Sequence, residues 1–135
     1  MKSTNLTIEE PHPIIDSVLQ ALVFMVNKHN YEINITLNVN GSIISGKLCS
    51  GKEYFNEIGE AFKQNAKIEK PEKMKEILDT SKQIGNMLYT ENSIDSKPPY
   101  IHLKDAIFFG KKNTSQHFLW RGKLSEVNGF HLGYS

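Results

Sequence analysis

Cysteine and arginine are nearly absent from this chain of 135 residues, which has one of each, Cys49 and Arg121. A single cysteine cannot form an intrachain disulfide, so cysteine usage does not indicate an oxidising compartment. It also excludes a structural zinc site of the cysteine-rich kind. The planar guanidinium of arginine is the group best suited to phosphate and guanine. One arginine among 16 basic residues therefore disfavours recognition of that type.

The chain also lacks a long hydrophobic run and a large net charge. Its longest mainly apolar stretch, residues 14–26, contains Asp16, Ser17 and Gln20 and is too short to cross a bilayer. The net charge of +1 excludes a strongly basic nucleic-acid arm and an acidic solvating tail. The first residues lack the basic start and apolar centre of a signal peptide, so we expect a cytoplasmic protein. The length predicts one domain over residues 1–135, with residues 1–12 as a flexible lead-in.

A β-hairpin is the clearest local pattern. Residues 31–39 alternate strictly between apolar and polar side chains, which is typical of a strand with one buried face. Asn40 and Gly41 follow, the dipeptide that closes a two-residue hairpin. With this loop Leu37 pairs with Ile44, and the remaining pairs are Ile35–Gly46, Ile33–Leu48, Asn38–Ile43, Thr36–Ser45 and Asn34–Lys47. Gly46 inside the second strand predicts a bend or bulge there.

Helical patterns flank this hairpin. Residues 14–26 place apolar side chains over an arc of roughly 200°, which predicts a helix packed deeply on a sheet, beginning near Pro13. Phe24 lies in the middle of the polar side of that helix and is a candidate for contact with a partner or a second copy. Residues 50–53 fit a capping box, and two helical patterns follow, the second opening at Pro71. We therefore expect a helical insertion over residues 51–97.

The rest of the chain returns to β patterns. Residues 100–109 predict a third strand in which Asp105 breaks the alternation, consistent with a bulge, and residues 116–124 predict a fourth. Asn128 and Gly129 predict a second turn before a short last strand. The fold class is therefore α+β, with an N-terminal helix, a strongly bent five-stranded antiparallel sheet and a two-helix insertion between strands 2 and 3. This order resembles the Sm-like small barrel, with an open sheet wrapped on the first helix as the alternative.

Residue patterns for catalysis or metal binding are weak, so we expect no enzyme, no cofactor and no resident metal. Residues 41–48 nearly match a phosphate-binding loop, but Leu48 replaces the required Ser or Thr, and the segment lies in a hairpin. His102 and His117 fall on neighbouring strands near Asp105, where a two-histidine metal site is the less favoured interpretation. Cys49 precedes a helix start, a position that can lower a thiol pKa, but we interpret it as a partly buried small residue.

Basic and aromatic residues near the C-terminus leave nucleic-acid binding open as an alternative. Residues 97–135 carry six basic and two acidic side chains, a local charge of +4, so residues 1–96 carry −3. Arg121 is one of the six basic residues, and Tyr100, Phe108, Phe109 and Trp120 could stack on bases. The candidate partner-binding residues are Phe24, Phe108 and Arg121. Most aromatic positions here would also be claimed by a sheet core, so nucleic acid is the disfavoured partner. The opposed charges favour self-association that salt would screen.

Several blocks of the sequence resemble the gas-vesicle accessory proteins of the U type (GvpU). They are residues 29–31, residues 34–46 (NITLNVNGSIISG), residues 50–55 (SGKEYF), residues 100–104 (YIHLK) and residues 120–133 (WRGKLSEVNGFHLG). Residues 63–97 and the first dozen match nothing in that family. The resemblance implies a non-enzymatic protein that assembles, organises or clusters gas vesicles. Its implied partners are the vesicle shell or other gas-vesicle proteins, and a Sm-like RNA-binding regulator is the alternative.

Overall fold

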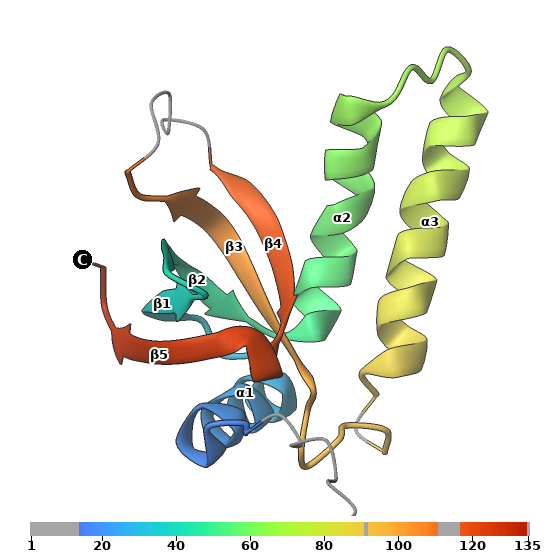
Figure 1. Ribbon diagram of the computed structural model, residues 1–135. Coiled ribbons are helices and arrows are strands. Elements are labelled where there is room, and N and C mark those ends of the chain that lie inside the picture. Colours follow the sequence, from blue (N-terminus) through green and yellow to red (C-terminus); the bar gives the residue numbers. More distant parts are fainter. Residues whose placement is uncertain (1–13, 91, 111–116, 135) are drawn as a thin grey trace, which may run out of the picture.

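The computed structural model describes residues 14–134 except residue 91 and residues 111–116. In chain order the elements are α1 (Ser17–His29), β1 (Ile33–Val39), β2 (Ser42–Cys49), α2 (Gly51–Asn65), α3 (Pro71–Leu88), β3 (Tyr100–Phe108), β4 (Phe118–Lys123), the 3-10 helix η2 (Leu124–Glu126) and β5 (Val127–Leu132). The five strands form one antiparallel sheet in the order β4-β3-β2-β1-β5. The α+β class and the helix pair between the second and third strands are confirmed (Figure 1). The predicted lead-in, residues 1–12, lies outside the described residues.

The sheet is open rather than a closed barrel. Strands β4 and β5 stand at its two ends and do not pair with each other. The chain passes from one edge to the other through η2, whose Leu124 is buried in the core and donates its backbone N–H to the Pro99 carbonyl at 2.9 Å. The alternative of an open sheet wrapped on the first helix is therefore the correct one.

The β1–β2 hairpin has the predicted register at every position, including Leu37 opposite Ile44. Both loop residues have positive φ, 53° at Asn40 and 91° at Gly41, as a two-residue hairpin turn requires. The bend at Gly46 is also confirmed, because the β2–β3 register shifts between Ser45 and Lys47. A Cβ atom at Gly46 would lie 2.9 Å from the Lys104 carbonyl oxygen, so only glycine lets β3 approach this closely.

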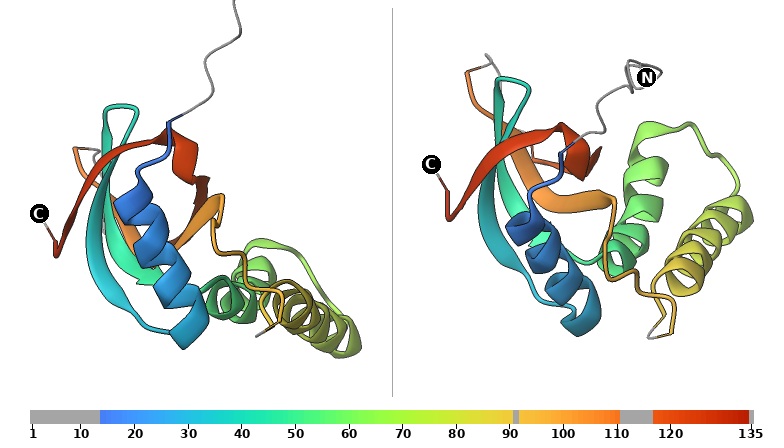
Figure 2. Two further views of the ribbon diagram at one scale, coloured as in Figure 1. Left: turned by 90° about the horizontal axis from the view of Figure 1, so that it is seen from below. Right: turned by 60° about the horizontal axis from the view of Figure 1, so that its bottom comes forward.

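Helix α1 packs in the hollow of the curved sheet through a narrow face (Figure 2). It begins at Ser17 and not near Pro13, because the Asp16 carboxylate caps it by accepting from the N–H groups of Val18 and Leu19. The predicted apolar arc is wider than the face that is buried. The core takes Leu19, Val23 and Val26, whereas Ile14, Val18 and Met25 are exposed. The sheet covers only one side of a helix that lies against it, so the flanks of the arc remain in water.

The predicted turn at Asn128 and Gly129 is wrong. Both residues lie inside β5, where Gly129 pairs with Asn38 of β1. The Asn128 amide oxygen instead accepts the backbone N–H of Asn40 at 2.5 Å and so holds the tip of the β1–β2 hairpin. The chain reverses three residues earlier, in η2. The dipeptide marks a contact between β5 and the tip of the β1–β2 hairpin, a relationship that a local turn rule does not contain.

Helices α2 and α3 form an antiparallel pair that extends away from the sheet (Figure 1). The α2 start is capped as predicted, with the Ser50 Oγ accepting the N–H of Glu53 at 3.0 Å. A Cβ atom on Gly85 of α3 would lie 2.9 Å from the Phe55 Cβ, so the two helices are in close contact near their attachment to the sheet. No helix among the described residues is long and apolar enough to cross a membrane.

Candidate functional site

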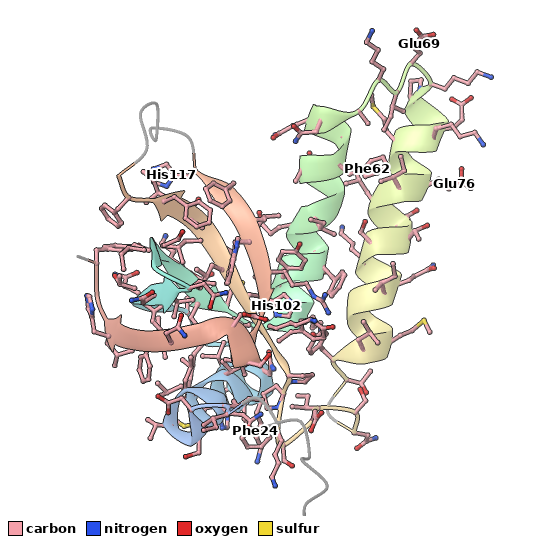
Figure 3. All side chains as sticks on the ribbon, viewed as in Figure 1. Phe24, Phe62, Glu69, Glu76, His102 and His117 are labelled. Atoms are coloured by element: carbon pink, nitrogen blue, oxygen red, sulfur yellow. The ribbon has the colours of Figure 1, made fainter. Side chains whose placement is uncertain are left out.

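Aromatic and titratable side chains gather at the base of the helix pair. His102 of β3 points from the outer face of the sheet into the space where α2 begins and α3 ends (Figure 3). Its ring centroid lies 4.8 Å from that of Tyr54, 6.2 Å from Phe55 and 5.9 Å from Tyr89. His102 is 1% exposed. This aromatic layer joins the helix pair to the sheet.

Arg121 completes the cluster from the neighbouring strand β4, directly opposite His102. Its Nε–H donates to the His102 Nε2 at 3.1 Å, so His102 accepts at Nε2 and carries its proton on Nδ1. The Arg121 guanidinium carbon lies 3.8 Å from the Tyr100 ring centroid, a cation–π contact. The His102 Nδ1 is buried and has no hydrogen-bond partner among the described residues.

Burial favours the neutral forms of His102, Tyr54 and Tyr89 in this cluster. Burial and, as the smaller cause, the nearby Arg121 charge together lower the pKa of His102 to about 3. Burial also raises the pKa values of Tyr54 and Tyr89, which Arg121 partly offsets. A histidine that stays neutral and already accepts a hydrogen bond from arginine is poorly placed to act as a general base at neutral pH. The cluster therefore connects elements rather than activating a substrate.

Cys49 lies beside this cluster, opposite His102 in the β2–β3 ladder. The sequence-based interpretation of Cys49 as a small buried residue, rather than a thiol activated by the helix start, agrees with the structure, and its burial is nearly complete. Cys49 is 1% exposed, and burial raises its pKa to about 12. A protonated thiol next to a neutral imidazole is not an activated nucleophile.

A cluster of charges adjoins the same helix base. The Lys104 ammonium binds the carboxylates of Glu32 and Glu53, the second at 3.3 Å. Burial alone would lower the pKa of Lys104, but the hydrogen bonds and charges of the two carboxylates raise it above its ordinary value. This contact with Lys104 of β3 draws the Glu53 side chain of α2 toward the sheet.

The three candidate partner-binding residues lie in three different environments. Phe24 is half-buried on α1, where the Lys28 ammonium lies 5.7 Å from its ring centroid (Figure 3). Phe108 is half-buried against the core and stacks on Phe118 at a centroid separation of 5.4 Å. Arg121 is held by the contacts with His102 and Tyr100. They share no single element or cluster.

The two histidines considered for a metal site, His102 and His117, also lie in different environments. His117 is exposed and its Nδ1 lies 3.2 Å from the Asp105 carbonyl oxygen, whereas His102 is enclosed under α2. Among the described residues no group of three His, Cys, Asp or Glu side chains could hold a metal ion. The segment resembling a phosphate-binding loop lies in the β1–β2 hairpin, so it cannot cradle a phosphate at a helix start.

The arrangement of His102, Arg121 and Tyr89 was missed by sequence reasoning. Strand alternation places His102 and Arg121 at facing positions only once the β3–β4 register is known, and that register shifts between Leu103 and Ala106. Tyr89 directly follows α3, and the periodic pattern of α3 does not indicate where this helix lies relative to the sheet. The available signal was the single arginine beside a histidine on adjacent predicted strands.

Comparison with known proteins gives one match. No curated protein and no solved structure matched the chain. The model of the family described as gas vesicle protein GvpU-like matches residues 16–135, which contain every described helix and strand. This confirms the resemblance carried by the sequence blocks, and it extends over residues 63–97, which lie outside those blocks. The chain belongs to the GvpU-like family of gas vesicle proteins.

Proposed function

We propose that this protein is a non-enzymatic accessory that organises or clusters gas vesicles through protein–protein contacts in the cytoplasm. The observation that carries the proposal is the open sheet of a gas-vesicle family member, in which β4 and β5 each have an edge that pairs with no other described strand. A free edge presents a row of backbone donors and acceptors, which is a ready template for pairing with another chain. The expected partners are the vesicle shell, other gas-vesicle proteins and further copies of this chain.

Exposed apolar side chains support association at more than one place. On β5 and the residues after it, Leu132 is 56% exposed and Tyr134 52%. Phe24, Lys28, His29 and Ile94 line a hollow of about 510 Å³ beside α1. A protein with several contact surfaces can bridge more than two partners, which is what clustering requires.

The charge distribution supports contact between copies. Residues 97–135 carry +4 and residues 1–96 carry −3. Attraction between such regions acts over about 10 Å at moderate ionic strength and is weakened by added salt. We therefore expect the apparent mass of the purified protein to fall as salt is raised.

Vesicle association is the experiment that tests the proposal. The tagged protein should float with gas vesicles on centrifugation, and deletion of its gene should disperse vesicle clusters in cells. Phe24→Lys should reduce co-flotation or self-association, because it places a charge in the α1 hollow. Val18→Lys is the matched control, since Val18 is 62% exposed on a different side of α1. A protein that never co-floats and whose loss leaves clusters unchanged has another function.

The RNA content of the purified protein tests the RNA-binding alternative. Phe108 packs on Phe118 and Arg121 is engaged with His102, so neither side chain is free for a base or a phosphate without losing these contacts. Protein purified with a raised 260/280 absorbance ratio and salt-sensitive RNA retention would reverse this assignment.

A further inference from the structure

Strand β4 has a hydrogen-bonded neighbour on one side only within the described sheet. The Leu124 N–H donates to the Pro99 carbonyl, so in the alternating pattern Gly122 and Trp120 also direct their backbone groups toward β3. The backbone groups of Leu119 and Arg121 then point the other way, toward the free edge. Their side chains lie on the outer face of the sheet, where α2 is attached.

A cleft lies between this strand and α2. Its volume is about 620 Å³, within the range of about 300–1,000 Å³ typical of ligand sites. Figure 1 shows α2 in contact with the sheet at its base and leaning away from β4 toward its other end. One wall comes from α2, with Glu57, Ile58 and Glu60, and the other from β3, β4 and the residue before β4, with Lys104, His117 and Leu119.

The cleft is acidic at its α2 rim and partly apolar within. Glu57 and Glu60 are exposed, and neither forms an ion pair with any described residue. Lys104, the basic side chain of the cleft, is already bound by Glu32 and Glu53. Ile58 and Leu119 are half-buried. Among the described residues nothing neutralises these two carboxylates, so a ligand would meet their negative charge beside apolar surface.

We propose that this cleft binds an extended, lysine-bearing segment of a partner protein, which pairs with β4 as a sixth strand. The backbone of the segment bonds the outward groups of Leu119 and Arg121. Alternate side chains on the α2 side reach Glu57 and Glu60 with their ammonium groups. Side chains in an extended strand alternate between faces, so lysines spaced two apart fit this rim.

A single strand suits this cleft better than a second copy of the chain. In a second copy, the edge strand β5 has β1 about 4.8 Å behind it. A paired copy would thus bring its own sheet against α2, which forms the opposite wall. A partner segment with nothing behind it meets no such obstacle. The inference deepens the proposed function on which it rests, because it names the kind of segment that would occupy the β4 edge to which that function assigns partner contacts.

Peptide binding to the purified full-length protein tests the proposal. The probe is a fluorescent peptide of about eight residues that alternates lysine and valine, long enough for a typical strand. Its fluorescence anisotropy should rise with protein concentration at low salt. Three control peptides should bind at least about tenfold more weakly. One alternates glutamate and valine. The other two are lysine peptides N-methylated on alternate amides, one for each of the two possible sets of amides.

Variants locate the site. Glu57→Lys with Glu60→Lys should weaken lysine-peptide binding at least about tenfold. Glu69→Lys with Glu76→Lys makes the same charge change near the far end of the helix pair and should leave it unchanged (Figure 3). Leu119→Pro removes one outward-facing N–H and spares the β3–β4 ladder, so it should also weaken binding. If that variant does not fold, the N-methylated peptides test the backbone contact instead.

Several results would overturn the inference. They are no binding of the lysine peptide at millimolar concentration, equal binding of the glutamate or both N-methylated peptides, or equal weakening by the two double variants. Loss of self-association in Leu119→Pro, with no peptide binding by the parent protein, would show that a second copy occupies this edge. Failure of vesicle association would leave the peptide result intact, so the two proposals fail separately.

Discussion

The buried histidine at the base of the helix pair makes this protein less stable at mildly acidic pH than at neutral pH. The pKa of His102 falls from 6.5 to about 3 on folding, because it is enclosed and faces Arg121. Between these values the unfolded chain binds a proton that the folded chain does not. Stability is therefore greatest above about pH 6.5 and decreases as the pH falls below it. From about pH 7.5 to about pH 5 the expected loss is about 2 kcal/mol, and the limit near pH 3 is about 5 kcal/mol.

Urea unfolding followed by Trp120 fluorescence measures this loss. The parent protein should lose about 2 kcal/mol of unfolding free energy over that pH range. His102→Gln keeps an acceptor for the Arg121 Nε–H but cannot titrate, so its stability should change much less with pH. His117→Gln, which alters an exposed histidine, should behave like the parent protein. If His102→Gln retains the full pH dependence, His102 is not the titrating group and the reasoning is refuted.

Three further predictions concern packing around the same fold. Gly51→Ala should destabilise the protein by about 1–3 kcal/mol in thermal or urea unfolding, because the added Cβ would lie 2.0 Å from the Tyr89 Cζ. Unchanged stability would mean that the Tyr89 ring moves aside freely. The Cys49 thiol is buried and its pKa is raised to about 12. It should therefore react with a thiol reagent in urea but not in the native protein at neutral pH. Rapid reaction of the native protein would contradict the burial of this thiol. Leu37→Ala should cost about 2–5 kcal/mol of unfolding free energy, because Leu37 is 0% exposed; a loss well below 1 kcal/mol would place it outside the core.

Local patterns predicted the parts of the fold whose causes are local. The alternation over residues 31–39 and the Asn40–Gly41 loop fixed one hairpin register, because a shift by one residue would exchange the buried and exposed faces. The Ser50 cap marked the start of α2 for a similar reason, since the hydroxyl and the N–H it satisfies are three residues apart.

Patterns that depend on distant partners were interpreted less well. Asn128 and Gly129 have the composition of a turn, yet they lie within β5 because Asn128 bonds the tip of a hairpin 88 residues away in the sequence. The apolar arc of α1 indicated a helix but not how much of it the sheet would cover. The candidate residues Phe24, Phe108 and Arg121 were chosen by type, and only the fold placed Phe108 against Phe118 and Arg121 against His102.

The sequence by itself determined the α+β class, the central hairpin and its register, the helix pair between the second and third strands, and the family. Each follows from side-chain periodicity, turn chemistry or blocks of residues contiguous in the chain. Only the tertiary structure decided that the sheet stays open, that His102 is neutral beside Arg121, and that α2 and β4 enclose an acidic cleft. These features depend on which strands become edges and how far a helix leans from a sheet. Contacts between residues far apart in the chain set both.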